Sequence, residues 1–312
     1  MTRAFLFPGQ GSQYIGMGKS LAEAFEPARL VFEEVNDALG QDLSKIMWDG
    51  PQDSLQMTEN TQPALMAHSL AVIKVLASDG KNVADLASHV AGHSLGEYSA
   101  LCAAGAISLA DTAKLLKLRG QAMQRAVPVG EGAMAAILGL EMDAVKQACD
   151  AAADLGVVVP ANDNGGGQVV ISGAKAAVEK AAELAKEAGA RRAVMLPVSA
   201  PFHCPLMQPA ADEMAEALAD AIITAPVVPV IANVTARPTQ DADEIRSLLV
   251  EQVCGSVRWR ETVASMSGLG IDTLIELGAG KVLSGMTRRI DKTLSGMNIQ
   301  DPEDLEKFIQ SL

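Results

Sequence analysis

The feature that most constrains this chain is an alternation of short apolar runs with longer segments of helical periodicity. Residues 3–7 (RAFLF) and 88–92 have the length of buried strands. Segments with apolar residues three and four positions apart follow each of them, including residues 108–126. Such alternation is typical of a mostly parallel sheet with helices on both faces. We therefore expect an α/β fold.

A second unit interrupts this alternation. The composition changes at residues 127–132 (VPVGEG), which we interpret as a hinge. Residues 130–198 then follow the order strand, helix, strand, strand, helix, strand, as in a ferredoxin-like domain. The larger alternation resumes afterwards, with helices expected near 205–221, 242–254 and 282–290 and strands near 227–234 and 272–277. We expect a large domain with a parallel sheet (residues 1–129 and 199–312) and an inserted ferredoxin-like small domain (residues 130–198).

The charge of the chain argues against nucleic acid as a partner. The formal net charge is −13, whereas a non-specific nucleic-acid binder carries a basic face.

No segment approaches the ~18 consecutive apolar residues of a membrane span, and residues 1–11 lack a signal-peptide core. The scattered cysteines have neither metal-ligand nor dithiol spacing, which predicts no metal site and a cytoplasmic location; they are Cys102, Cys149, Cys204 and Cys254.

The strongest local signal is Gly92-His93-Ser94-Leu95-Gly96, which matches G-x-S-x-G where a strand gives way to a helix. The glycines allow a sharp turn that exposes the Ser94 hydroxyl. The helix N-terminus and the Leu95 N–H would point at an oxyanion formed beside it. The structural alternative is a chance glycine-rich turn, but the strand-to-helix context favours a nucleophile.

A serine needs a base, and the chain has four histidines. His68 falls in an apolar helix and His89 in a strand, so a structural role is favoured for both. His93 adjoins Ser94, where chain geometry turns its ring away from the hydroxyl, although it can line the site. His203 lies between two prolines where the chain returns from the small domain, near the cleft between the domains. It is the candidate base by elimination, against the alternative of a structural histidine.

No acidic residue between Ser94 and His203 stands out as the third member of a triad. We therefore expect a dyad in which a backbone or amide carbonyl orients the histidine.

Several segments together, in order along essentially the whole chain, resemble the malonyl-CoA:acyl carrier protein transacylase family of bacterial type II fatty acid synthesis. They are FPGQGSQ (7–13), GHSLGEYSA (92–100), LRG (118–120), QVVISG (168–173), PFH (201–203) and QV (252–253). The resemblance implies an α/β-hydrolase-like large domain carrying a ferredoxin-like insertion. It also implies ping-pong transfer of malonyl from malonyl-CoA to the phosphopantetheine thiol of the carrier protein, through a malonyl-serine and without a cofactor.

The resemblance implies roles for the matching residues. Ser94 would be acylated and His203 would be the base. The backbone N–H groups of Gln10 and Leu95 would form the oxyanion hole, where one lost donor typically costs ~10²–10³ in rate. Gln252 would orient His203 through its carbonyl, in place of a triad acid.

Arg119 separates this family from a plain esterase. Malonate carries a free carboxylate, which a guanidinium can hold with two parallel charge-assisted hydrogen bonds. The alternative is a salt bridge at a helix end. Polar residues that match those lining or supporting the family's site are Gln62, Asn164 and Gln168.

The chain departs from the family's pattern at two positions. Phe202 precedes the proposed base where many bacterial members have a small residue. A bulky neighbour should crowd an α-methyl branch and favour malonyl over methylmalonyl. Ala279 replaces a common proline in the loop 278–280 and touches no assigned role.

The expected partner, an acyl carrier protein, is acidic like this chain, so a local basic patch must overcome the repulsion within a Debye length of ~8–10 Å. Ordinary solvated charges are the alternative. The candidates are Arg191, Arg192, Arg288 and Arg289, with Lys186 and Lys292 nearby in sequence. We expect a monomer, since no heptad or exposed apolar stripe is visible.

Three other functions stay open from the sequence. A serine thioesterase or esterase would release acyl groups to water, and Arg119 argues against it. A carrier-binding module with a dead site would not need Ser94, His203 and Arg119 together. An acyltransferase that loads a polyketide carrier would use the same chemistry, and the sequence does not separate it from one of fatty acid synthesis.

Overall fold

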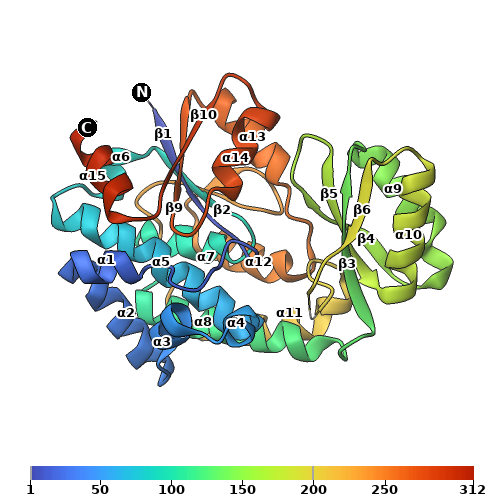
Figure 1. Ribbon diagram of the computed structural model, residues 1–312, viewed down its shortest axis with the longest axis horizontal. Coiled ribbons are helices and arrows are strands. Elements are labelled where there is room, and N and C mark those ends of the chain that lie inside the picture. The colour runs from blue at the N-terminus through green and yellow to red at the C-terminus, as the bar shows by residue number, and fades with distance from the viewer. Residues whose placement is uncertain (1, 199) are drawn as a thin grey trace.

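A six-stranded sheet runs through the larger part of the computed structural model, which describes residues 2–198 and 200–312 (Figure 1). The strand order is β10-β9-β1-β2-β7-β8, and every neighbouring pair is parallel except β7 with β8. The predicted mostly parallel sheet is confirmed, whereas the predicted domain limits at residues 1 and 199 lie outside the described residues. The strands are β1 (Arg3–Phe7), β2 (His89–Gly92), β7 (Val230–Ile231), β8 (Pro238–Thr239), β9 (Thr273–Leu277) and β10 (Ser295–Ile299).

Helices cover both faces of this sheet, because its strand residues alternate between two apolar layers. Phe5 and Phe7 pack in one layer, and Ala4 and Leu6 in the other, with Trp259. The helices of the first layer are α1 (Lys19–Ala24), α2 (Glu26–Leu39), α3 (Leu43–Asp49), α4 (Gln52–Gln56), α5 (Thr58–Ser78), α6 (Val83–Leu86), α7 (Gly96–Ala103), α8 (Leu109–Ala126), α11 (Gln208–Asp220), α12 (Ala242–Cys254) and α15 (Pro302–Gln310); those of the second are α13 (Trp259–Gly268) and α14 (Val282–Ile290). None of the helices in the described residues is long and apolar enough to cross a bilayer.

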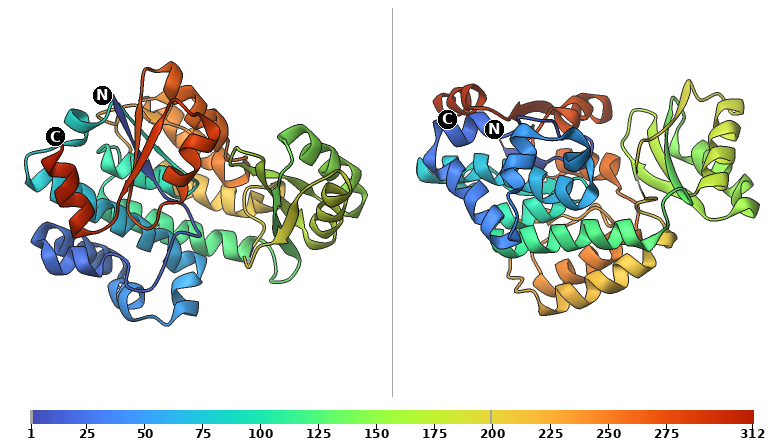
Figure 2. Two further views of the ribbon diagram at one scale, coloured as in Figure 1. Left: turned by 45° about the horizontal axis from the view of Figure 1, so that its top comes forward. Right: turned by 60° about the horizontal axis from the view of Figure 1, so that its bottom comes forward.

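A separate four-stranded antiparallel sheet forms the smaller part, with the order β4-β5-β3-β6. Its helices lie on the face turned away from the larger part (Figures 1 and 2). In β3, Ala135 and Ile137 pack under those helices, whereas Met134 joins the core of the larger part. The elements follow the predicted order: β3 (Gly132–Leu138), α9 (Met142–Ala151), a short 3₁₀ turn (Ala153–Leu155), β4 (Val158–Asp163), β5 (Gln168–Ala174), α10 (Lys175–Glu187) and β6 (Arg192–Met195).

The C-terminal third departs from the sequence-based expectations in several elements. The strand predicted over 227–234 is limited to β7, because Pro229 has no N–H to donate to a ladder and the chain turns directly after Ile231, where the Ala236 N–H donates to the Ala232 carbonyl. The helix predicted from 205 begins as a 3₁₀ turn (Pro205–Met207) before α11. The edge strand β10 and helix α15 were not predicted. Residues 295–297 of β10 are exposed, so that strand carries no apolar signal.

Two glycines close the turn after β2. A Cβ on Gly92 would lie 1.9 Å from the Gly96 carbonyl, and a Cβ on Gly96 would lie 2.2 Å from the Phe7 carbonyl oxygen. Backbone atoms cannot move aside as side-chain ends can. The end of β1, the end of β2 and the start of α7 therefore meet only because these positions lack side chains.

We expect Gly96→Ala to lower the free energy of unfolding by about 3 kcal/mol or more, since the new methyl group overlaps the backbone of β1. Urea denaturation followed by circular dichroism measures this change. The matched control is Gly285→Ala in α14, where a Cβ meets open space and helix propensity predicts a gain of about 0.5–1 kcal/mol. A Gly96→Ala protein as stable as the wild type would show that the turn has room to relax.

Candidate active site

Ser94 lies on the turn after β2 with a backbone φ of 54°, a left-handed conformation that costs a non-glycine residue free energy. Asn233, just after β7, forms two side-chain hydrogen bonds to the backbone of this turn. Its side-chain oxygen accepts the Ser94 N–H at 2.7 Å, and its amide nitrogen donates to the Gly92 carbonyl at 2.7 Å. Asn233 was not among the predicted site residues; its position shortly after a buried strand of the same sheet is the only sequence signal for it.

His203 faces the Ser94 hydroxyl. Its Nε2 lies 2.7 Å from Ser94 Oγ, and its Nδ1 lies 2.9 Å from the backbone carbonyl of Gln252 and 3.1 Å from that of Gly255. Carbonyl oxygens only accept, so Nδ1 carries the proton and Nε2 presents its lone pair to the hydroxyl. His203 also has a positive φ, of 58°, which aims its ring from the loop before α11. The geometry is the expected dyad, oriented by backbone carbonyls rather than by an acid.

The histidine is neutral at physiological pH. Burial, followed by the nearby positive charge of Arg119, lowers the pKa of His203 from 6.5 to about 3, against the opposing effect of the two carbonyls. A neutral imidazole with a free Nε2 lone pair can take a proton from a hydroxyl.

Arg119 of α8 is 1% exposed and reaches the same point. Its Nη2 donates to Ser94 Oγ at 3.1 Å and to Gln252 Oε1 at 2.9 Å, and its Nη1 donates to Gln62 Oε1 at 2.9 Å. Helices α5 and α8 approach closely here because Gly120 has no side chain; a Cβ would lie 2.5 Å from the Glu59 backbone. Within the described residues Arg119 forms no ion pair, so the helix-end salt bridge weighed above is wrong.

The backbone N–H groups of Gln10 and Leu95 lie at the same edge of the sheet. Strands β1 and β2 are parallel with Phe7 opposite Gly92, so the segments that follow them emerge side by side. Neither N–H donates a hydrogen bond to an acceptor in residues 2–198 and 200–312. Both residues line the same cavity as Ser94, and both donors are free for an anionic oxygen.

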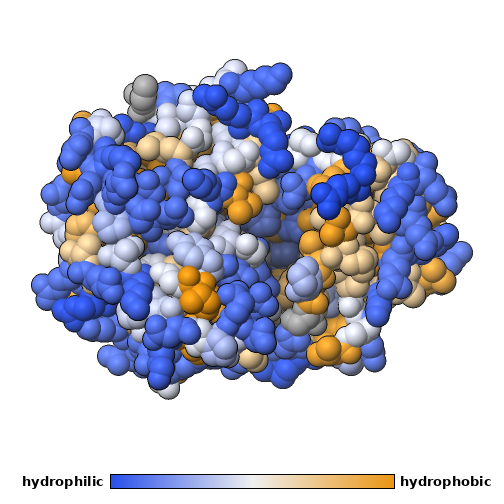
Figure 3. All heavy atoms as spheres, viewed as in Figure 1, coloured by the Kyte–Doolittle hydropathy of each residue, from blue (hydrophilic) through white to orange (hydrophobic). Residues whose placement is uncertain are grey.

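These groups surround one cavity of about 160 Å³ between the larger and smaller parts, where the surface is hollowed (Figure 3). His93 also lines it, turned toward Asn164 with its Nε2 3.0 Å from the amide oxygen, as the chain geometry led us to expect. The predicted site residues that line the cavity are Gln10, Gln62, His93, Ser94, Leu95, Arg119, Asn164, Phe202 and His203.

Two predicted site residues do not line this cavity. Gln252 is fully buried behind Arg119 and contacts it directly. Gln168 begins β5 and lines a different hollow, although its carbonyl accepts the N–H of Asn164 at 3.0 Å. The structure therefore places Gln168 behind the cavity wall and not among the groups that face Ser94.

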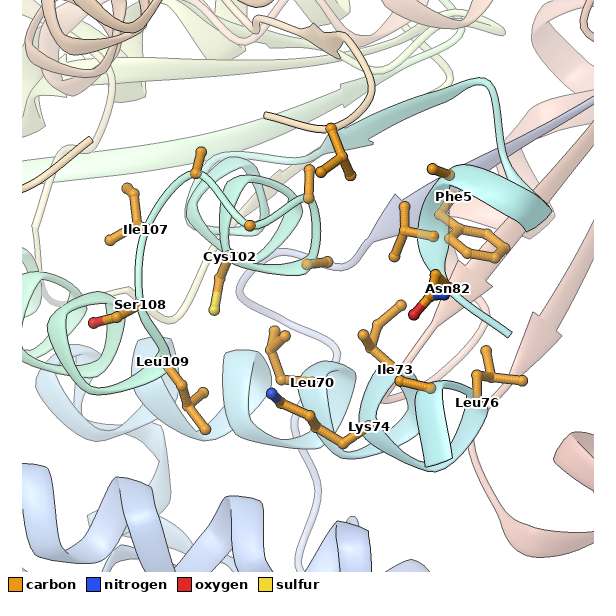
Figure 4. Close-up of a pocket in the computed structure, with 18 of the residues that line it drawn as sticks. Phe5, Leu70, Ile73, Lys74, Leu76, Asn82, Cys102, Ile107, Ser108 and Leu109 are labelled. Atoms are coloured by element: carbon orange, nitrogen blue, oxygen red, sulfur yellow. The ribbon is translucent and has the colours of Figure 1, made fainter. Parts of the chain in front are cut away.

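A larger hollow of about 690 Å³ lies elsewhere and contains none of the predicted site residues (Figure 4). Its walls include apolar side chains of α5, such as Leu70 and Ile73, and Cys102 from the end of α7. Burial raises the pKa of Cys102 to about 11, so its thiol is not a nucleophile at neutral pH. The smaller cavity is therefore the candidate active site. In the part of the chain that the structure describes, no group of histidine, cysteine or acidic side chains could hold a metal ion.

The basic residues singled out in the sequence come together in part. Arg191 and Arg192, at the start of β6, line one small hollow with Arg289 of α14. Arg288 is the preceding residue of α14 and is exposed. This hollow spans the larger and smaller parts.

A serine hydroxyl, a neutral histidine and free N–H donors are the groups that an acyl-transfer reaction uses. On this α/β fold they define the class of protein as an acyltransferase, and comparison with known proteins agrees. The chain matches the acyl transferase domain family over residues 4–302. It belongs to that family and, within it, to the malonyl CoA-acyl carrier protein transacylases.

Individual relatives cover nearly the whole chain. The malonyl CoA-acyl carrier protein transacylase of Bacillus subtilis (strain 168) is 46% identical over 99% of this chain and 96% of its own length. The crystal structure of acyl-carrier-protein-S-malonyltransferase from Bartonella henselae is 56% identical, with a TM-score of 0.98 over 100% of this chain and 99% of its own. A malonyl-transacylase solved in complex with its type II PKS acyl-carrier protein is 44% identical, with a TM-score of 0.97 over the full length of both chains.

The lowered pKa of His203 predicts that its ring does not titrate between pH 5 and 8. Proton NMR of the histidine Cε1–H signals, with His203→Gln to assign the resonance, measures this directly. In urea-unfolded protein the same resonance should titrate near the ordinary value of about 6.5. A folded-state midpoint above pH 6 would contradict the burial argument.

Proposed function

We propose that this acyltransferase moves the malonyl group of malonyl-CoA to the phosphopantetheine thiol of an acyl carrier protein through a malonyl ester of Ser94. The observation that carries the proposal is Arg119, a buried cation that touches the Ser94 hydroxyl and has no carboxylate partner among the described residues. The names of the relatives, and the carrier-protein complex of one of them, support the same substrates.

In the first half-reaction, Ser94 Oγ attacks the thioester carbonyl while His203 Nε2 takes the hydroxyl proton. The carbonyl oxygen becomes an oxyanion that accepts hydrogen bonds from the Gln10 and Leu95 N–H groups. The carbon–sulfur bond then breaks, the malonyl group stays on Ser94, and the proton from His203 leaves with CoA as its thiol.

The second half-reaction reverses these steps with another thiol. The phosphopantetheine thiol gives its proton to His203 and attacks the ester carbonyl. The Ser94 carbon–oxygen bond breaks, and His203 returns the proton to Ser94 Oγ. The same N–H donors serve both halves, and no cofactor is needed because the thioester supplies an activated acyl group.

Arg119 would hold the malonate carboxylate with paired hydrogen bonds. Gln62 is proposed to fix one side of the guanidinium, and His93 with Asn164 to form the opposite polar wall of the cavity. Gln168 would support Asn164 through its backbone carbonyl, without contacting the substrate. Gln252 would orient His203 through its own backbone carbonyl.

We also propose the finer structural assignments. The order β4-β5-β3-β6, with both helices on one face, supports a ferredoxin-like domain of residues 130–198. The serine turn after β2 supports an α/β-hydrolase-like domain formed by residues 1–129 and 199–312. Four free cysteines fit a reducing cytoplasm, and a monomer is the proposed assembly.

Intact-protein mass spectrometry after brief mixing with malonyl-CoA tests the proposed reaction. We expect a malonyl-sized mass gain that is absent in Ser94→Ala and disappears when holo carrier protein is added. Ser99→Ala, which alters a buried serine one turn further along α7, is the matched control and should acylate normally. An adduct that decays in buffer as fast as it forms would instead establish a thioesterase.

Phe202 is proposed to select malonyl over methylmalonyl. Its side chain is 8% exposed and lines the cavity beside His203, where an α-methyl branch would need room. We expect Phe202→Ala to raise the kcat/KM for methylmalonyl-CoA relative to malonyl-CoA by roughly 10–200-fold. This is the discrimination that a pocket typically achieves between substrates differing by one methylene group. Steady-state kinetics with both thioesters measures the ratio. Equal kcat/KM values in the wild type would refute the role.

The hollow between Arg191, Arg192 and Arg289 is proposed, with Arg288, to receive the acidic carrier protein. Reversing Arg288 and Arg289 to Glu should raise the KM for carrier protein by about tenfold with kcat unchanged, because steering is lost and the chemistry is not touched. Lys19→Glu with Lys45→Glu gives the same charge change on α1 and α3, away from α14 (Figure 1). Equal KM values for carrier protein in the two double variants would show that this basic hollow does not bind it.

A further inference from the structure

The charge of Arg119 is compensated indirectly. Its guanidinium is buried, and the oxygens it contacts directly are neutral: Gln62 Oε1, Gln252 Oε1 and Ser94 Oγ. Removing an unpaired cation from water is costly, and burial lowers the pKa of Arg119. The Tyr98 ring, 5.7 Å from the guanidinium carbon, offers only a weak attraction. A counter-charge is therefore needed nearby.

Glu97 is the carboxylate in position to provide it. It lies in the first turn of α7, three residues after Ser94, and is 2% exposed. Its Oε2 accepts hydrogen bonds from Gln252 Nε2 at 2.8 Å and from the Asn233 N–H at 2.9 Å. No sequence argument had assigned it a role.

Gln252 connects Glu97 to Arg119. Its amide nitrogen faces Glu97 and the Ser94 carbonyl, at 2.8 and 3.0 Å, while its amide oxygen faces Arg119 Nη2 at 2.9 Å. The reversed amide would point its oxygen at a carboxylate and its N–H groups at a guanidinium. An ionised Glu97 therefore fixes the orientation of the amide.

We propose that Glu97 is a positioning residue that compensates the charge of Arg119 through the Gln252 amide and so keeps the guanidinium free to bind an acyl group that carries its own carboxylate. This inference rests on the proposed function, in which malonyl is that group. A carboxylate in direct contact with Arg119 would compete with malonate for the same N–H donors. A carboxylate held one amide away stabilises the cation, while only the neutral amide oxygen of Gln252 takes one of its N–H groups.

Binding of malonyl brings a second carboxylate to the same guanidinium. Burial already raises the pKa of Glu97 to about 7, against the opposing effects of its two donors and of Arg119. A new negative charge raises that pKa further, so Glu97 takes up a proton as malonyl-CoA binds. The other charged or titratable groups near Glu97 are Arg119 and Tyr98, while Gln252 and Asn233 are neutral.

The test uses Ser94→Ala protein, so that thioesters bind without reacting. In this background Glu97→Gln removes a negative charge, and the dissociation constant for malonyl-CoA should fall by at least about tenfold while that for acetyl-CoA stays unchanged. Glu97→Asp keeps the charge, so its preference for malonyl-CoA over acetyl-CoA should equal that of the Ser94→Ala parent. A purely steric role for Glu97 would not predict this result. Glu276→Gln, at a buried carboxylate on β9, is the matched control and should change the dissociation constant of neither malonyl-CoA nor acetyl-CoA.

Proton uptake gives a second readout that needs no variant of Glu97. Calorimetry of Ser94→Ala protein at pH 7.5, in two buffers with different ionisation enthalpies, should show uptake of part of a proton with malonyl-CoA and none with acetyl-CoA. Absence of uptake, or equal malonyl-CoA affinity with and without Glu97→Gln, overturns the inference and leaves the proposed function standing. Equal affinity of the Ser94→Ala parent for both thioesters would overturn the proposed function and this inference together.

Discussion

The register of two parallel strands determines the rest of this site. Pairing of β1 with β2 sets Phe7 opposite Gly92, and the glycines at 92 and 96 let the two strand ends and the start of α7 approach within backbone contact. The segment after β1 then supplies the Gln10 N–H beside the Ser94 turn. A shift of one residue in this register would separate the nucleophile from one of its two free N–H donors.

Burial then sets the chemistry of the groups that gather at this point. His203 loses its affinity for protons because it is buried beside a cation, and this leaves it a neutral base. Arg119 keeps its charge through surroundings that compensate it without contacting it as an ion pair. One positive charge therefore acts on the histidine, on the nucleophile and, in the proposed reaction, on the carboxylate of the acyl group.

The sequence contained most of this site but not its supports. Ser94 could be predicted because G-x-S-x-G fell at a strand-to-helix junction, and His203 because few histidines competed with it. Glu97 could not, since its role comes from contacts between α7, α12 and the loop after β7 that no local pattern encodes. Asn233 carried only a weak signal, its position shortly after a buried strand of the same sheet. Gln168 was expected to line or support the site and lies behind Asn164, because the turn at 164–168 directs only Asn164 into the cavity. Strand β10 escaped detection because an exposed edge strand has no apolar alternation.

In the proposed function, Arg119 makes this an enzyme for acyl groups that carry a carboxylate. The most direct measurement is the ratio of kcat/KM for malonyl-CoA to that for acetyl-CoA, in the wild type and in Arg119→Ala. Arg119→Ala should lose about 2–5 kcal/mol of selectivity, a fall of at least roughly 30-fold in the ratio, as expected for a buried charge pair. A ratio that stays the same after Arg119 is removed would contradict it.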